Sequence, residues 1–271
     1  RAGATLPPVD THEQRCAVLD ASLAAFPDLV VAFSGGVDSS VLLHAAGRVL
    51  GPRVVALIGD SASLPRRELA EARAFAAGLG LACELLATDE LASEDYRRND
   101  GARCYHCRHA LFTGMEGWAR AHGFRVLAYG EITDDLAEPR PGRAAAAECQ
   151  VRAPLREAGF SKADVRRYAR AHALAVAEKP AAACLASRLP PGTRVTRAAL
   201  ARIEAAEESL RGLGFGTLRV RDHGARARVE LCEADLERAR AQAGELAARL
   251  APHGFAELEL ALHRRPTAGT A

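Results

Sequence analysis

A short apolar run followed by a glycine- and serine-rich turn restricts the fold of this chain more than any other feature. The stretch "VVAFSGGVDSS" (30–40) leads from a strand-like run into an apolar helix pattern. Gly35 and Gly36 let the backbone pass close to a ligand, and the amides that open the next helix favour an anion. Asp38 would repel phosphate unless a divalent cation bridges the two. The motif is neither a Walker A loop nor a dinucleotide fingerprint. Its plain alternative is an ordinary tight strand–helix turn.

Strand and helix patterns alternate through the first part of the chain. Apolar runs at 28–33, 53–59, 81–87 and 124–130 predict strands, and helical patterns separate them. This order predicts an α/β fold with a doubly wound parallel sheet. Ligands bind such sheets at the carboxyl ends of the strands. "SKAD" (161–164) predicts a capping box that opens a further helix.

The pattern changes after a segment rich in Pro, Gly and small residues at 179–196. The elements expected beyond it are a helix (196–213), strands at 217–223 and 226–232, a helix (234–250) and a strand (256–262). We therefore expect a first domain over 1–185, a smaller C-terminal α+β domain over 190–263, and a disordered tail at 264–271.

Composition excludes several classes of protein. The 271 residues carry 36 basic and 34 acidic side chains, and the net charge of +2 gives no global footprint for nucleic acid. The seven cysteines are odd in number and irregularly spaced, which argues against a disulfide framework. No leader and no long apolar run is visible. We expect a protein of the reducing cytoplasm with no membrane partner.

Two cysteines stand three positions apart in "GARCYHCRHALF" (101–112), at the predicted start of a helix. Cys104 and Cys107 could hold a metal, run a redox cycle or form a disulfide. A structural zinc site would take His106 or His109 as a further ligand. A thioredoxin-like pair is disfavoured because a phosphate loop follows the first strand. The remaining cysteines, interpreted as structural, are Cys16, Cys83, Cys149 and Cys232.

The stretch at 30–40 resembles the signature of the PP-loop ATP pyrophosphatases, of the adenine nucleotide alpha hydrolase-like fold. These enzymes split ATP between the α and β phosphates and transfer AMP to a carbonyl or carboxylate oxygen. The resemblance implies ATP and Mg²⁺ as cofactors. The residues it places on the pyrophosphate are Ser34, Gly35, Gly36, Asp38, Ser39 and Ser40. Those it places near the adenine, at the ends of the first two strands, are Ala32, Phe33, Ile58 and Asp60.

Further motifs resemble the LarE family of ATP-dependent sulfur transferases, which complete the nickel-pincer nucleotide cofactor. They are "GDSASLPRREL" (59–69), "RCYHC" (103–107), "RPGRAAA" (140–146), "APLREAGFSKADVR" (153–166) and "KPAAACLASRLPPGT" (179–193). The resemblance implies a pyridinium biscarboxylic acid mononucleotide as substrate, whose carboxylates become thiocarboxylates, and a homo-oligomer such as a hexamer. One departure is "GEITDD" (130–135), where the family carries "GTNADD". Asp134 and Asp135 remain, and the resemblance implies that one of them, which we expect to be Asp135, helps Asp38 to hold magnesium.

The resemblance makes Cys184 the pivotal residue. In some members a single cysteine at this place gives up its own sulfur. Members with an additional Cys-x-x-Cys resemble thiolases that hold a 4Fe-4S cluster on three thiolates, which leaves one iron open. We therefore expect Cys104, Cys107 and Cys184 to form one cluster site, with zinc as the alternative and the sulfur donor unspecified. Arg188 is expected to lower the pKa of the Cys184 thiol.

The predicted C-terminal domain places Arg219 and Arg221 on the same face of a strand. Paired arginines suit a phosphate or carboxylate. The alternative is a solvated, arginine-rich strand face. The family resemblance favours substrate or metal binding by these arginines together with Glu230 and Glu207.

Two other functions remain open from the sequence. A tRNA thiolase would need a basic RNA surface and more Cys-x-x-Cys pairs than the single one present. A non-catalytic nucleotide- or zinc-binding protein would not turn over ATP. Pyrophosphate release therefore separates an enzyme from a sensor.

Overall fold

The computed structural model describes residues 11–137 and 141–263, and these form two compact units. The first unit comprises the described residues up to 60, together with 66–88 and 108–182. The second comprises 61–65, 89–107 and the described residues from 183 onward. The boundary expected between 185 and 190 stays a prediction. The predicted tail at 264–271 lies outside the described residues.

The first unit contains a four-stranded, wholly parallel sheet in the order β3-β2-β1-β4. Its strands are β1 (Leu29–Ala32), β2 (Val54–Asp60), β3 (Ala82–Ala87) and β4 (Leu127–Tyr129). In the centre, Val31 pairs with Ala56 on one side and Ala128 on the other. The predicted parallel sheet is confirmed. Because β1 lies between β2 and β4, the loop after β1 sits where the strand order reverses.

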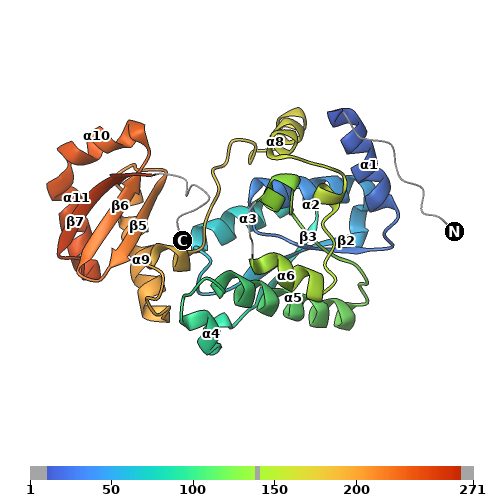
Figure 1. The fold of residues 1–271 in the computed structure, drawn as a ribbon. Coiled ribbons are helices and arrows are strands. Elements are labelled where there is room, and N and C mark those ends of the chain that lie inside the picture. Colours follow the sequence, from blue (N-terminus) through green and yellow to red (C-terminus); the bar gives the residue numbers. More distant parts are fainter. Residues whose placement is uncertain (1–10, 138–140, 264–271) are drawn as a thin grey trace. The chain divides into compact units, whose positions relative to one another are not determined.

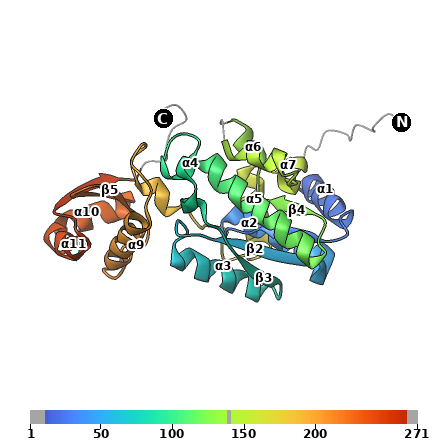
Figure 2. The same cartoon turned by 90° about the horizontal axis from the view of Figure 1, so that it is seen from below.

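Helices cover both faces of this sheet. They are α1 (His12–Ala24), α2 (Val37–Leu50), α3 (Arg66–Gly78), α5 (Arg103–His122, whose first turns belong to the second unit), α6 (Pro141–Glu148), α7 (Pro154–Glu157) and α8 (Lys162–Ala171). Figure 1 shows α2 and α8 on one side of the sheet and α5 and α6 on the other. Figure 2 shows α6 alongside α5. The predicted capping box is present, because Ser161 Oγ accepts from the amide of Asp164 and the Asp164 carboxylate accepts from the amide of Ser161. Within the described ranges, every helix is too short or too polar to cross a membrane.

The second unit is built around a three-stranded sheet in the order β5-β6-β7. Its elements are α4 (Glu94–Arg97), α9 (Arg197–Arg211), β5 (Leu218–His223), β6 (Arg226–Leu231), α10 (Glu233–Ala241), α11 (Ala243–Leu250) and β7 (Glu257–Leu262). β5 and β6 form an antiparallel hairpin through Gly224, whereas β7 runs parallel to β6. The predicted single helix at 234–250 is two helices, because the backbone leaves helical geometry at Gln242. The expected α+β character is confirmed.

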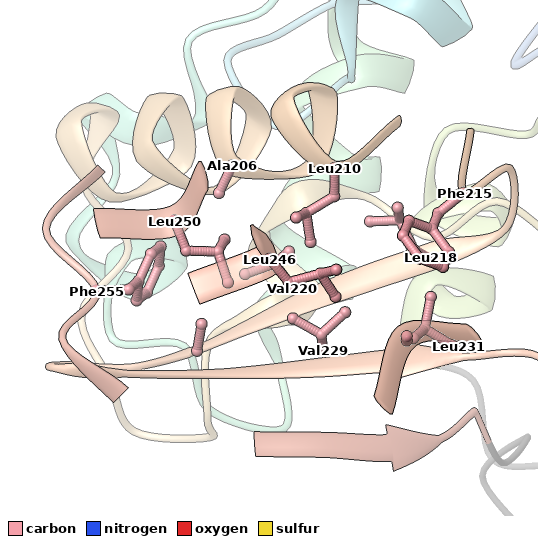
Figure 3. Close-up of a cluster of buried hydrophobic side chains, with 12 residues drawn as sticks. Ala206, Leu210, Phe215, Leu218, Val220, Val229, Leu231, Leu246, Leu250 and Phe255 are labelled. Atoms are coloured by element: carbon pink, nitrogen blue, oxygen red, sulfur yellow. The ribbon is translucent and has the colours of Figure 1, made fainter. Parts of the chain in front are cut away.

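A hydrophobic core joins the helices and sheet of the second unit. Figure 3 shows Ala206 and Leu210 of α9 directed towards Val220 and Val229 of the sheet. These four side chains are fully buried. Their burial stabilises the sheet by about 1.5–3 kcal/mol for each large side chain. The opposite face of β5, which bears Arg219 and Arg221, is only partly buried and stays available for polar contacts.

Candidate functional site

The phosphate loop connects β1 to α2 as predicted. Gly35 adopts a φ of +70°, and a Cβ at this position would lie 2.8 Å from the Cβ of Ala72. Only glycine meets both conditions without strain. Gly36 is the N-cap of α2 and provides no side chain to cap it. The first-turn amides therefore face the loop without a capping side chain, which is the arrangement that binds anions at helix N-termini.

Serines line this turn. Ser34 Oγ and Ser39 Oγ lie 3.1 Å apart, and the amide of Gly36 donates to Ser34 Oγ at 3.4 Å. The Ser40 hydroxyl is buried and has no hydrogen-bond partner among the described residues. A buried hydroxyl without a partner is unusual in a folded protein, and a bound ligand or ion is a common reason for one.

The end of β4 packs directly against the loop. A Cβ on Gly130 would lie 2.7 Å from the amide nitrogen of Ser39 and 2.9 Å from its Cα. No larger residue fits without displacing the phosphate loop. The segment that follows, 131–135, is therefore held next to α2.

Asp38 is paired with a lysine that the sequence did not identify as part of the site. The Nζ of Lys162 lies 2.8 and 2.7 Å from the two carboxylate oxygens of Asp38. Lys162 is the first residue of α8, and its amide donates to Asp134 Oδ1 at 3.2 Å. The sequence feature that could have drawn attention to Lys162 is the scarcity of lysine, since the chain has only this lysine and Lys179. Asp135 instead accepts from the amide of Ile132 at 3.2 Å.

The departure at Glu131 has a structural explanation. The Glu131 side chain is 2 % exposed, and its two oxygens accept from Arg143 at 3.1 Å and Arg156 at 2.5 Å. Burial, reinforced by Glu131, raises the pKa of Tyr129. Ile132 is buried as well. The segment that differs from the family pattern is thus tied into an internal ion network beside the loop.

The residues expected around adenine lie at the ends of β1 and β2. Phe33 and Ile58 are buried, and the Phe33 ring packs 5.9 Å from the ring of Phe75. Asp60 accepts from Arg66 at 2.5 Å, and Ala32 closes β1. Two of the four side chains therefore belong to the core. Their adenine contacts stay a prediction.

The three predicted site cysteines all lie in the second unit. Cys104 and Cys107 occupy the first two turns of α5, and Cys184 precedes a short 3-10 turn at 185–188. Cys107 and Cys184 pack against the same buried cluster, formed by Tyr96, Leu185, Ala186, Leu189, Val195, Leu200 and Ile203. None of these three cysteines forms a disulfide. In the described ranges, no three His, Cys, Asp or Glu side chains already form a set close enough for a metal ion.

Arg103 and Tyr96 lie close enough to the cysteines to interact with them electrostatically. Burial favours a neutral Arg103, but interaction with Cys184 and Cys104 outweighs it and raises the pKa of this guanidinium. Burial, reinforced by Cys184 and Cys107, raises the pKa of Tyr96. The Tyr96 hydroxyl forms a hydrogen bond with Ser63 Oγ. The backbone carbonyl of Ser63 in turn accepts a hydrogen bond from the amide of Leu185 at 2.8 Å. Cys184 therefore shares one neighbour with each member of the Cys-x-x-Cys pair.

The other four cysteines fit structural roles. Burial raises the thiol pKa of Cys16, Cys83 and Cys149, which keeps these thiols protonated. Cys232 has a partner that the sequence did not suggest, because its Sγ donates to Asp235 at 3.4 Å.

Arg188 and Glu207 form a buried ion pair. Their side chains are 6 % and 0 % exposed, and Arg188 Nε lies 2.9 Å from Glu207 Oε1. Arg188 also donates to the carbonyls of Ala183 and Cys184, at 2.5 and 3.0 Å. Glu207 accepts further bonds from Arg211 and from the amide of Val220. The guanidinium of Arg188 thus holds the backbone at Cys184, and its predicted effect on the thiol stays a prediction.

A cavity of about 510 Å³ opens within the second unit. It is lined by Asn99, Asp100, Gly101, Arg103, Ser187, Arg188, Leu189, Pro190, Pro191, Arg221, His223, Arg228 and Glu230. Arg221 pairs with Glu230 through two bonds of 3.0 and 3.1 Å and donates to the carbonyl of Ser187 at 2.6 Å. The cavity therefore contains Arg221 and Glu230 from the predicted substrate set, whereas Glu207 and Arg219 are not among its lining residues.

Three arginines of the second unit, Arg188, Arg219 and Arg221, lie close to one another. Burial, followed by repulsion from Arg188 and Arg221, lowers the pKa of Arg219. Burial opposes ionisation of Glu230, but its bonds to Arg221 outweigh this and lower its pKa. Such a group of cations suits an anionic ligand.

The chain is similar to several known proteins, although no family model matches it. It is 36% identical over 219 residues to pyridinium-3,5-bisthiocarboxylic acid mononucleotide synthase of Lactiplantibacillus plantarum, which covers 80% of this chain and 79% of that protein. It is 41% identical over 202 residues to the uncharacterized protein slr1717 of Synechocystis, which covers 74% of this chain and 75% of that one.

A shorter similarity reaches a different enzyme. The chain is 34% identical over 143 residues to tRNA(Ile)-lysidine synthase of Burkholderia mallei, which covers 49% of this chain and 28% of that protein. This match agrees with the PP-loop fold. Similarity to the mononucleotide synthase spans both units, and with the phosphate loop it shows that the chain belongs to the LarE family of ATP-dependent sulfur transferases.

Proposed function

We propose that this enzyme converts the carboxylates of a pyridinium biscarboxylic acid mononucleotide into thiocarboxylates, as a step of nickel-pincer nucleotide biosynthesis. The printed activity of the Lactiplantibacillus relative supports this substrate. The cavity of the second unit supports it too, because Arg103, Arg221 and Arg228 suit the anionic groups of a mononucleotide. We further propose that the enzyme acts in the cytoplasm as a homo-oligomer.

ATP would bind at the phosphate loop of the first unit. Its pyrophosphate part would contact the α2 amides and the serine hydroxyls, with adenine near the ends of β1 and β2. Lys162 neutralises Asp38 in this structure. When phosphates arrive, we expect Lys162 to turn to them and release Asp38 for Mg²⁺, with Asp135 as a second ligand. Magnesium would supply positive charge against the phosphates.

Adenylation makes the thiolation chemically feasible. A substrate carboxylate oxygen attacks the α phosphorus of ATP, and the bond to the β phosphate breaks as pyrophosphate leaves. Sulfur then attacks the carbonyl carbon of the acyl adenylate, and the carbon–oxygen bond breaks as AMP departs. A free carboxylate is a poor electrophile, so the transfer depends on this activation.

The sulfur site would be formed by Cys104, Cys107 and Cys184. The donor chemistry fits an iron–sulfur cluster, because Arg103 neighbours Cys104 and Cys184, and Tyr96 neighbours Cys107 and Cys184. Three thiolates on a 4Fe-4S cluster leave one iron for an added hydrosulfide. Arg103 would offset the negative charge of the thiolates, because it neighbours both Cys104 and Cys184. This grouping is the observation that carries the cluster over sacrifice of Cys184, because sacrifice needs only one thiol.

Anaerobic purification, iron and sulfide analysis, and turnover with ATP and the biscarboxylate mononucleotide test the proposal. We expect bound iron, pyrophosphate release, thiocarboxylate product, and an unchanged mass for the peptide containing Cys184. Loss of one sulfur from that peptide per product would replace the cluster route with sacrifice of Cys184. Absence of substrate-dependent pyrophosphate release would refute the enzyme function and favour a non-catalytic nucleotide- or zinc-binding protein. Sulfur incorporation into tRNA would favour a tRNA thiolase.

A further inference from the structure

Asn99 connects two segments of the second unit that are far apart in sequence. It lies between α4 and α5, is 2 % exposed and has a φ of +56°. Its Nδ2 donates to the carbonyl of Pro190 at 2.8 Å, and its Oδ1 accepts from Arg103 Nη1 at 2.5 Å. Its own carbonyl accepts from the amide of Gly192 at 2.9 Å. The side chain of Asn99 thus bonds to the start of α5 through its oxygen and to the segment around Pro190 through its nitrogen.

Arg103 extends the connection to the cysteines. The same Nη1 that meets Asn99 also donates to the carbonyl of Ala186 at 2.9 Å. Ala186 follows Cys184 by two residues, and Arg103 immediately precedes Cys104. The side chains of Asn99 and Arg103 therefore join the start of α5 to the segment that carries Cys184. Arg103 contacts this segment at Ala186, close to Cys184, and Asn99 contacts it further along, at Pro190.

The backbone alone does not account for asparagine at this position. A φ of +56° is strained for most side chains, and glycine adopts it most readily. Asparagine tolerates it and adds a donor and an acceptor. Both form hydrogen bonds with other residues of the second unit. The residue therefore serves the contact between segments as well as the turn.

We propose that Asn99 is a positioning residue that, through Arg103, holds Cys184 at a fixed distance from Cys104 and Cys107. This inference rests on the proposed function, in which the three thiols act together. Groups that react or bind together gain from being held in one geometry, because the cost of ordering them is met during folding. Loosening residues 186–190 would leave the thiols intact but spread Cys184 over more positions.

A cross-linking experiment on the full-length, reduced, metal-free chain measures this distance without relying on turnover. Dibromobimane, a short reagent that bridges two thiols, is applied to a Cys107→Ser background. Mass spectrometry of tryptic peptides then reports the bridge from Cys104 to Cys184. Asn99→Gly preserves the left-handed backbone and removes both side-chain bonds. We expect it to slow bridging about fivefold or more, while alkylation of each thiol by monobromobimane changes less than about twofold.

Asn99→Asp is the matched second variant, because it keeps an oxygen for Arg103 and loses only the donor to Pro190. We expect its bridging rate to lie between those of the parent and Asn99→Gly. Equal bridging in the Cys107→Ser parent and in its Asn99→Gly variant would overturn the inference. So would a Cys107→Ser parent that does not bridge, when the wild-type enzyme forms thiocarboxylate. Failure of the proposed function would be seen separately, as no ATP-dependent thiocarboxylate from the wild-type enzyme.

Discussion

Replacing Gly35 by alanine tests whether the phosphate loop is sterically restricted as the structure indicates. Two costs add. A φ of +70° costs an alanine about 1–2 kcal/mol. The new methyl carbon would also lie 2.8 Å from Ala72 Cβ, which has no rotamer through which to move away, and overpacking of this kind costs about 1–3 kcal/mol. We expect Gly35→Ala to lower the free energy of unfolding of the first unit by about 2–5 kcal/mol.

Gly36→Ala is the matched control in the adjacent position. Its φ is −77°, and a Cβ there meets only Ser34 Oγ at 3.5 Å, an ordinary contact. The change should alter stability by less than about 1 kcal/mol, since the loss of the glycine N-cap and the smaller entropy of the unfolded chain oppose each other.

Urea unfolding followed by tryptophan fluorescence measures the difference within the first unit. The single tryptophan, Trp118, lies on the part of α5 that belongs to this unit and stacks on His122. With a urea dependence of about 2 kcal/mol per molar, the midpoint of Gly35→Ala should fall by about 1–2.5 M. If both variants unfold at the same urea concentration, the loop relaxes from Ala72 without cost and the steric argument is wrong.

Three further predictions follow from charged groups. Lys162→Ala should reduce ATP-dependent pyrophosphate release about tenfold or more, whereas Lys179→Ala, which removes a lysine bound to glutamates of α3, should change it less than about twofold in the same assay. Burial, followed by repulsion from other cations, lowers the pKa of His44 to about 4. Between pH 6.5 and 4, the His44 imidazole therefore binds a proton in the unfolded chain more readily than in the folded chain. The free energy of unfolding should fall by about 3 kcal/mol as the pH drops through this range. Urea midpoints of His44→Gln should depend less on pH than those of the wild type. Glu207→Ala should destabilise the second unit by about 3–5 kcal/mol, because it leaves Arg188 buried without its counter-charge, and calorimetry that finds a loss below about 1 kcal/mol would contradict this.

Local sequence patterns predicted the elements that position the phosphate loop. Apolar runs separated by helical patterns predicted the parallel sheet, because the buried strands β1, β2 and β4 carry few polar residues. The glycine pair predicted backbone angles that other residues rarely adopt, and the φ of Gly35 agrees, while the predicted approach to a ligand stays a prediction. The capping box at 161–164 was predicted from four consecutive residues. Each of these features depends on neighbours in sequence, which is why the sequence alone was sufficient.

Contacts between distant segments could not be predicted in the same way. Asn99 and Pro190 are 91 positions apart, and Arg103 and Ala186 are 83 apart. Lys162 was recognised as part of a capping box, while its bond to Asp38 spans 124 positions. No periodicity indicates such pairs. Family resemblance supplied the grouping of Cys184 with the Cys-x-x-Cys pair, but it did not supply the side chains that tie their segments together.

The hydrogen bonds of Glu207 limit how this residue could take its predicted role in binding substrate or metal. The carboxylate accepts from Arg188, Arg211 and the amide of Val220, and its side chain is fully buried. A ligand that contacted it would have to displace one of these donors and leave that donor buried without a partner, which costs about 1–3 kcal/mol or more. Arg188 in turn holds the carbonyl of Cys184. Any ligand that drew Glu207 away would therefore also loosen the backbone that carries the sulfur, so binding at Glu207 and the placement of Cys184 are coupled.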